Sequence, residues 1–202
     1  MTDFDVAKML GSADPVEASA LTKLHSRLAI AADEKGLLDV AYRTLDSPVG
    51  TLLLAATERG VVRIAYAVEG HDAVLQRLAD QVSPRILLAP ARLEAVVREL
   101  DEYFAGTRRS FDLALDHSLS HGFRRCVLEQ LPQIGYGHTA SYAEVARAAG
   151  SPRAVRAVGS ACATNPLPLV VPCHRVVRSD GSQGGYVGGL EAKRILLTLE
   201  AA

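Results

Sequence analysis

Cys173 and His174 place a thiol directly beside an imidazole. A cysteine reacts as its thiolate, and a neighbouring histidine is one way to make that thiolate available near neutral pH. We interpret the pair as a nucleophilic cysteine with its base. The alternative is a buried, inert cysteine beside a surface histidine. The dipeptide alone does not choose between the two, so the surrounding segments must decide.

The other sulfur atoms do not suggest a metal site. The three cysteines, Cys126, Cys162 and Cys173, cannot all pair with one another. The sequence contains no C-x-x-C, and only His174 lies close to a cysteine, so we expect no metal and no cofactor. An odd number of cysteines without an export signal is typical of the reducing cytoplasm, where we place the protein. We expect Cys126 to be a packed core thiol.

The chain has 202 residues, of which 49% are hydrophobic, and this suits one largish domain or two small ones. No apolar stretch reaches the roughly 20 residues of a membrane-spanning helix, so we expect no membrane partner. Residues 1–121 carry 13 Lys and Arg against 18 Asp and Glu, whereas residues 122–202 carry 9 against 5. The basic C-terminal half hints at contact with a polyanion, although ordinary surface variation is the simpler explanation for so small a difference.

The pattern over residues 1–118 predicts a helical extension followed by a small unit of strands and helices. Apolar residues at helical spacing indicate a helix over residues 15–35, which Gly36 ends. This half shows no catalytic constellation of its own. We expect strands at residues 41–45, 52–57, 61–68 and 111–115, and helices near residues 74–82 and 93–104.

The segment from Ser141 to Gly150 is predicted to form a short helix. Ser141 and Glu144 match an S-x-x-E capping box, in which each side chain bonds the backbone N–H of the other residue. Gly150 would end this helix. A second helix close behind would complete a helix-turn-helix unit, a common DNA-binding motif, and a plain pair of core helices is the alternative.

Residues 151–163 predict that second helix, with Ser151 as its cap and Pro152 at its first position. Arg153 and Arg156 stand three apart, so we expect them to be neighbours on the helix surface. Most other outward residues are small, which would let the helix press against a nucleic-acid backbone. The expected inner face consists of Val155, Val158 and Cys162.

A short, stiff connection joins this helix to Cys173. Pro166 and Pro168 rule out a regular helix, and Asn165 can bond nearby backbone and stiffen a turn. A nucleophile tied rigidly to a DNA-reading helix suggests chemistry performed on DNA.

These segments together resemble the active-site signature of the O6-alkylguanine-DNA alkyltransferases. The resemblance rests on N-P-L-P-L-V-V-P-C-H-R-V-V at residues 165–177, S-Y at 141–142, R-A-V-G at 156–159 and G-G-L at 188–190, followed by Lys193. It covers about residues 40 to 200. It implies an α+β fold: a small N-terminal α/β domain of ribonuclease H-like type at residues 40–118, and a mostly helical C-terminal domain with a helix-turn-helix at residues 119–202. Residues 1–39 would be a helical extension.

The resemblance also implies an activity, which is direct DNA repair. An alkyl group would pass from O6 of guanine to Cys173 in a single, irreversible turnover after the base is flipped out of the duplex. His174 would withdraw the thiol proton through a bridging water, with Glu200 polarising the imidazole. Tyr142 would donate a proton toward the departing guanine, and Asn165 would brace the turn and bond near the thiol.

The same resemblance predicts the DNA interface and the base pocket. Arg156 would enter the base stack and hold the place of the extruded base. The partner would be double-stranded DNA containing O6-alkylguanine, and we expect a monomer. The other predicted DNA contacts are Arg153, Ser141, Ala157 and Arg175, and the predicted base pocket is lined by Val176, Tyr186, Val187 and Gly188.

Two other functions compete with this one. A non-catalytic alkyltransferase-like protein would bind the lesion without repairing it, but such relatives lack the acceptor cysteine that Cys173 supplies here. A cysteine hydrolase unrelated to DNA would turn over repeatedly, but no fixed oxyanion motif is visible in the sequence.

Overall fold

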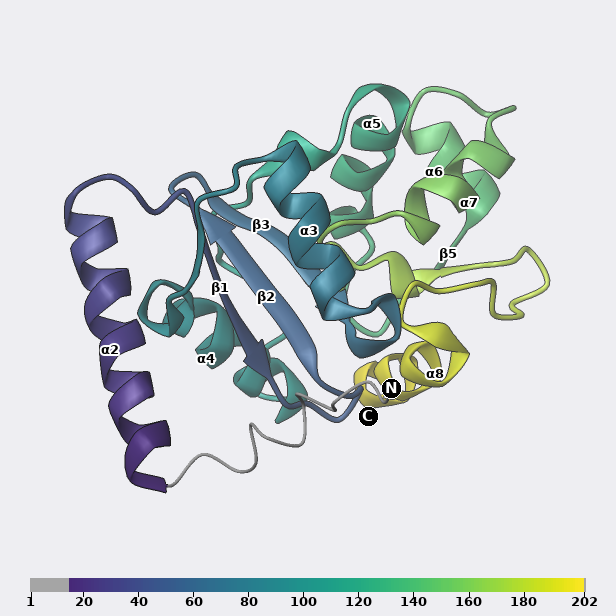
Figure 1. The fold of residues 1–202 in the computed structure, drawn as a ribbon. Coiled ribbons are helices and arrows are strands. Elements are labelled where there is room, and N and C mark those ends of the chain that lie inside the picture. Colours follow the sequence, from purple (N-terminus) through teal and green to yellow (C-terminus); the bar gives the residue numbers. More distant parts are fainter. Residues whose placement is uncertain (1–14, 202) are drawn as a thin grey trace, which may run out of the picture.

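The computed structural model describes residues 15–201, so the predictions for residues 1–14 lie outside the described part. Its N-terminal half is built on a four-stranded sheet in the order β3-β2-β1-β4 (Figure 1). β1 and β2 are antiparallel, as are β2 and β3, whereas β4 runs parallel to β1. The strands are β1 (Val40–Leu45), β2 (Leu52–Thr57), β3 (Gly60–Tyr66) and β4 (Ile86–Leu88).

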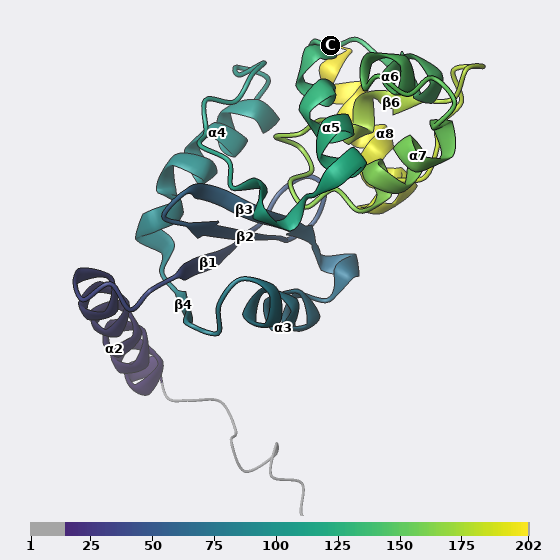
Figure 2. The same cartoon turned by 90° about the horizontal axis from the view of Figure 1, so that it is seen from above.

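Side chains alternate between the two faces of the sheet along each strand, and each face packs into a core of its own. In β2, Leu52 and Leu54 face one core, whereas Leu53 and Ala55 face another. The second core includes the buried residues of α3 (His71–Gln81), and the first includes those of α4 (Glu94–Phe104) and of the C-terminal half. Figure 2 shows α3 and α4 on opposite sides of the sheet.

The predicted strand over residues 111–115 is wrong. This segment runs beside only the beginning of β3. There, Val61 N donates to Ala114 O at 2.9 Å, and Asp116 N donates to Val61 O at 2.8 Å. The pairing amounts to one isolated parallel bridge between Val61 and Leu115. β4 was not predicted, because three apolar residues give too short a pattern to separate a strand from a loop.

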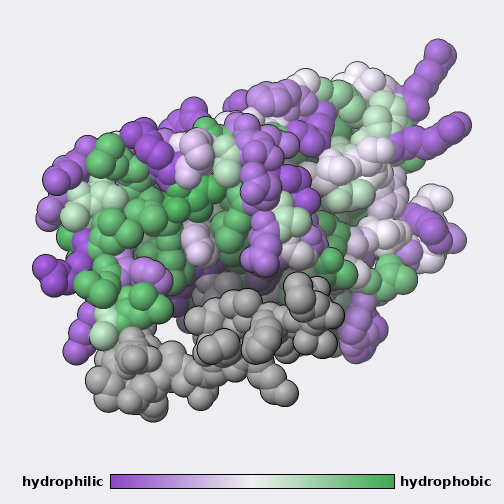
Figure 3. Space-filling view, in the orientation of Figure 1, coloured by the Kyte–Doolittle hydropathy of each residue, from purple (hydrophilic) through white to green (hydrophobic). Residues whose placement is uncertain are grey.

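Helix α2 (Pro15–Glu34) agrees with the predicted helix over residues 15–35 and lies at the edge of the sheet, away from the C-terminal half (Figures 1 and 2). Its buried Ala29 and Ala32 pack with Leu38, Ala41 and Ala89. Apolar residues gather on the surface around α2 and the adjoining sheet (Figure 3). The exposed ones on the helix include Leu21, Leu24, Leu28 and Ile30.

The C-terminal half is mostly helical and shares one apolar core with the α4 face of the sheet. A two-stranded parallel ladder joins two segments within it: Ala140 pairs with Val176, and Ser141 pairs with Val177. The elements are α5 (Gly122–Gln130), β5 (Ala140–Ser141), α6 (Tyr142–Ala148), α7 (Val155–Ala163), β6 (Val176–Val177) and α8 (Gly189–Glu200).

The capping box of α6 is confirmed. Ser141 Oγ accepts from Glu144 N at 3.2 Å, and the Glu144 carboxylate accepts from Ser141 N at 2.6 Å. The prediction for α7 is wrong at its start. The helix begins at Val155 with Ala154 as its uncapped N-cap, because residues 151–154 form a turn closed by a bond from Ala154 N to Ser151 O at 2.9 Å.

This later start changes which side chains α7 presents. Arg153 precedes the helix, so it is not a helical neighbour of Arg156. Val155 is 37% exposed and not on the inner face, whereas Val158 and Cys162 are buried as expected. Cys126 of α5 is exposed, which contradicts its assignment to the core.

Among residues 15–201, no helix has both the length and the apolar character to cross a membrane.

Candidate active site

The turn before Cys173 is held by the side chain of Asn165, which is fully buried. Asn165 Oδ1 accepts from Leu167 N at 3.0 Å, and Nδ2 donates to Val171 O at 2.8 Å. These two bonds span the turn, in which Leu169 has a φ of 74°. Such a left-handed conformation costs a non-glycine residue roughly 1–2 kcal/mol, so the turn needs this external bracing.

The same amide reaches the sulfur. Asn165 Nδ2 lies 3.1 Å from Cys173 Sγ. Cys173 is 2% exposed and begins a 3₁₀ turn, Cys173–Arg175. Burial raises the pKa of the Cys173 thiol to about 11, although the Asn165 hydrogen bond and the charge of Lys193 oppose the rise. The resting thiol is therefore protonated and needs a base before it can react.

Glu200 at the end of α8 supplies the negative charge of the site. Burial alone would raise its pKa, but hydrogen bonds from His174 and Arg175 outweigh burial and lower the pKa to about 2. Arg175 donates two hydrogen bonds to the carboxylate, from Nε and from Nη2, each at 2.9 Å. Tyr103 Oη donates at 2.7 Å, and Gly137 N lies at 3.4 Å. This buried carboxylate is therefore ionised and accepts from all four groups.

The ionised carboxylate fixes the tautomer of His174. His174 Nε2 lies 2.8 Å from Glu200 Oε1, and an ionised carboxylate only accepts, so Nε2 carries the proton. Burial lowers the pKa of His174, which opposes a second proton despite the nearby Glu200. His174 Nδ1 therefore carries a lone pair that can accept a proton. It is buried and has no hydrogen-bond partner among residues 15–201.

The β5–β6 ladder brings Tyr142 to the same region, because Tyr142 directly follows β5 and β6 follows the 3₁₀ turn of Cys173. A Cβ at Gly184 would collide with the Tyr142 hydroxyl, so this loop approaches the phenol closely. Burial raises the pKa of Tyr142, and the phenol stays protonated. It can therefore donate a proton.

The predicted base-pocket loop lies against the sheet. Tyr186 Oη is 2.8 Å from Tyr66 Oη of β3. A Cβ at Gly188 would stand 2.7 Å from the Tyr66 ring, so only glycine fits at this distance. Val187 is partly buried beside Gly188. The carbonyl of Val176 accepts from the buried Lys193 Nζ at 2.6 Å and keeps one lone pair for a ligand.

Four predicted DNA contacts lie on the surface of the α6–α7 unit. Arg153, Arg156 and Ala157 are exposed, and no hydrogen bond or ion pair of either guanidinium occurs among the described residues. Ser141 is partly exposed, and its hydroxyl belongs to the capping box. Long hydrophilic side chains project from this end of the molecule in Figure 3.

Arg175 does not belong with them. Its side chain is buried, with the residue 6% exposed, and its guanidinium is occupied by Glu200 and by Ile134 O at 2.6 Å. A side chain so enclosed cannot reach a phosphate, which corrects its assignment to the DNA interface. Arg175 instead holds Glu200 in its ionised form.

Three residues of the N-terminal half reach the site and were not predicted. Tyr103 of α4 donates to Glu200, Tyr66 of β3 contacts Tyr186, and Arg63 of β3 donates to Asn165 O at 3.1 Å. Tyr103 and Tyr66 occupy apolar faces at helical or strand spacing, so their pattern indicates core. Only the polar Arg63 within a buried strand was a signal that a partner must exist.

Comparison with known proteins gives matches over both halves. Residues 122–202 match the family model "6-O-methylguanine DNA methyltransferase, DNA binding domain", and residues 40–117 match its "ribonuclease-like domain". A methylated-DNA–protein-cysteine methyltransferase of Methanosarcina barkeri is 38% identical over 159 residues, 79% of this chain and 96% of the relative. The protein of that name from Mycolicibacterium paratuberculosis is 41% identical over 167 residues, 80% of this chain and 92% of the relative.

Solved structures agree with these matches. The O6-methylguanine methyltransferase of Mycobacterium tuberculosis superposes with a TM-score of 0.69 at 37% identity, over 80% of this chain and 93% of that chain. A complex described as Mycobacterium tuberculosis OGT with DNA gives a TM-score of 0.67 at 38% identity, over 80% of this chain and 92% of that chain. The α+β architecture predicted from the sequence is thereby confirmed.

Proposed function

Because this chain belongs to the family of methylated-DNA–protein-cysteine methyltransferases, we propose that it repairs DNA by taking an alkyl group from O6 of guanine onto Cys173. The observation that carries the assignment of the acceptor is the protonated, buried sulfur held by Asn165 and followed by a neutral His174 with a free Nδ1. The enzyme is a single-turnover alkyl acceptor, because the thioether product is stable.

The reaction begins with a flipped base, since an alkyl group on O6 is inaccessible inside the duplex. The thiol proton passes through one water to His174 Nδ1, and the resulting imidazolium is stabilised by the ionised Glu200. The Cys173 thiolate attacks the alkyl carbon, so an S–C bond forms as the C–O6 bond breaks. The electron pair leaves with the guanine, toward which Tyr142 donates a proton.

The surrounding residues receive roles to match. We assign Val176, Tyr186, Val187 and Gly188 to the base pocket. Arg156 takes the place of the extruded base, while Arg153, Ser141 and Ala157 contact the backbone. Double-stranded DNA containing O6-alkylguanine is the partner. We propose a monomer, because every group assigned to the site comes from one chain, and we place it in the cytoplasm on the basis of its odd number of cysteines.

The test is transfer from a duplex containing a single O6-methylguanine, followed by mass spectrometry of the peptides. We expect one methyl per protein, on Cys173, and none in a Cys173→Ala variant. Transfer to Cys126 or Cys162 in the folded wild type would refute the assignment. Tight binding without transfer would favour a lesion-flagging protein, and repeated hydrolysis of small esters would favour a hydrolase.

A further inference from the structure

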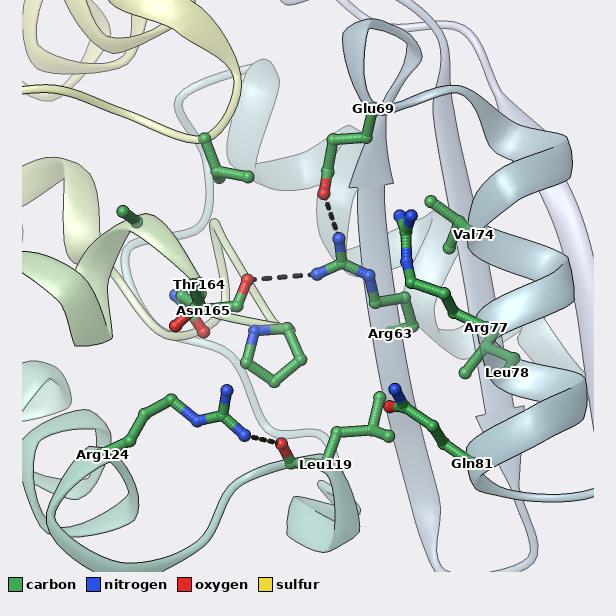
Figure 4. A pocket seen from close by; sticks show the side chains of 13 residues that line it. Arg63, Glu69, Val74, Arg77, Leu78, Gln81, Leu119, Arg124, Thr164 and Asn165 are labelled. Atoms are coloured by element: carbon green, nitrogen blue, oxygen red, sulfur yellow. Dashed lines mark hydrogen bonds and ion pairs between the residues drawn. The ribbon is translucent and has the colours of Figure 1, made fainter.

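The middle of β3 contacts the turn before Cys173 from the N-terminal half. Arg63 Nη1 donates to Asn165 O at 3.1 Å, across 102 positions of sequence. One residue further along, Ile64 N donates to Pro166 O at 2.9 Å. Two consecutive residues of the strand therefore hold two consecutive carbonyls of the turn. Figure 4 shows the first of these bonds, with Arg63 projecting from the strand toward Asn165.

Glu69 orients the Arg63 guanidinium. Its carboxylate pairs with Arg63 Nη2 (Figure 4), and its other oxygen accepts from Tyr66 N at 2.9 Å. The Arg63 and Glu69 side chains are only 12% and 14% exposed. Because the carboxylate is itself anchored to the backbone of β3, the guanidinium has little rotational freedom. The other terminal nitrogen of Arg63, Nη1, is thus directed at the backbone carbonyl of Asn165.

Asn165 links this contact to the reacting atom. Its backbone carbonyl receives Arg63, and its side-chain amide lies 3.1 Å from Cys173 Sγ. A residue held at its carbonyl cannot shift its side chain by rotating the peptide plane. The position of the amide beside the sulfur is therefore set partly by β3.

We propose that Arg63, oriented by Glu69, is a positioning residue for alkyl transfer, which fixes Asn165 and through it the sulfur of Cys173. This inference rests on the proposed function and extends it, because it gives the N-terminal half a part in the chemistry. Misplacement of a reacting group by about 1 Å can cost on the order of a hundredfold in rate.

The cavity around Arg63 makes it possible to test its positioning role without unfolding the protein. The Arg63–Glu69 pair and Asn165 line a cavity of about 400 Å³ between α3 and the C-terminal half (Figure 4). Water can enter a polar cavity of this size and solvate Asn165 O when the guanidinium is removed. A variant at Arg63 should therefore keep its fold and lose the restraint on Asn165.

The test compares Arg63→Met with Arg77→Met as its matched control. Arg77 lines the same cavity from α3, is exposed, and has no hydrogen bond or ion pair among the described residues. Each variant is assayed for single-turnover transfer from O6-methylguanine duplex between pH 6 and 10 and for affinity to undamaged duplex.

We expect Arg63→Met to slow transfer by about tenfold or more at neutral pH, with DNA affinity within about twofold of wild type. Its pH profile should move to higher pH, because a loosened Asn165 stabilises the thiolate less. Glu69→Gln should change the profile in the same direction by less. Arg77→Met should match wild type in rate and profile. Arg63→Lys should fall between, since one ammonium cannot serve both partners.

Three results would overturn the inference: a wild-type rate in Arg63→Met, a loss no larger than its loss of DNA affinity, or an equal loss in Arg77→Met. If Arg63→Met fails to fold, Arg63→Lys decides by the same criteria. Absence of methyl transfer in the wild type would instead refute the proposed function, so the two failures are distinguishable.

Discussion

At the scale of single residues, Glu200 decides the protonation of the whole site. Its ionised carboxylate keeps the proton on His174 Nε2, leaves Nδ1 with a free lone pair, and balances the buried charge of Arg175. The resemblance to the O6-alkylguanine-DNA alkyltransferases implied that Glu200 polarises His174. It could not identify Tyr103, which is 97 positions away and belongs to the other half.

Acid should destabilise the protein through this carboxylate. The folded pKa of Glu200, about 2, lies below its ordinary value of 4.5, so its stabilising contribution is complete above pH 4.5 and is lost as pH falls toward 2. We expect Glu200→Gln to reduce the free energy of unfolding at pH 7 by about 3 kcal/mol, because it leaves Arg175 buried without its anion.

Urea titrations from pH 7 to pH 2.5 provide the measurement. The difference in the free energy of unfolding between wild type and Glu200→Gln should become smaller as the pH falls. Curves that stay parallel over this range would contradict the ionised, stabilising carboxylate.

At the scale of elements, local signals predicted the structure well and long-range contacts did not enter the prediction. The capping box at Ser141 identified the start of α6, because its bonds connect residues three positions apart. The start of α7 was misplaced, because Ser-Pro is an ordinary helix opening and the turn over residues 151–154 competes with it. The strand expected at residues 111–115 failed because its neighbour, β3, pairs with it at one bridge only.

The true start of α7 separates the roles of its two arginines. Arg156 lies in the first turn of the helix, whereas Arg153 precedes it. We expect Arg156→Ala to slow transfer from duplex DNA by an order of magnitude or more, because the vacated stack is no longer filled. The thiol should stay reactive toward a free O6-alkylguanine base, which needs no flipping.

Arg153→Ala is the matched comparison. We expect weaker binding at all sequences and a salt dependence reduced by about one unit of slope, since only a phosphate contact is lost. Equal transfer rates for Arg156→Ala and wild type on duplex DNA would refute the role of Arg156.

At the scale of the whole molecule, the two halves form one site through contacts from β3 and α4. β3 contacts the turn before Cys173 and the loop of Tyr186, and α4 supplies Tyr103. Composition gave no indication of this cooperation, because Arg63, Tyr66 and Tyr103 acquire their partners only through folding. The charge asymmetry between the halves was the only signal in the composition that pointed to DNA.

Helix α2 lies at the opposite edge of the sheet from the site (Figures 1 and 2). Its packing residues, Ala29 and Ala32, belong to the small cluster beside β1 and β4. We therefore expect removal of residues 1–35 to leave the transfer rate within about twofold of wild type, with Tm lowered by several degrees from the lost burial. A large loss of transfer at a temperature where the shortened chain is folded would show that α2 acts on the site.

The enclosure of Cys173 has a consequence for the idle protein. Exposed thiolates attack peroxides and glutathione disulfide and are thereby oxidised, but the sulfur of Cys173 is neither exposed nor ionised at rest. Cys126 stands in the solvent and would take such damage first. A protein that can react only once therefore keeps its reactive cysteine intact for longer under oxidative stress.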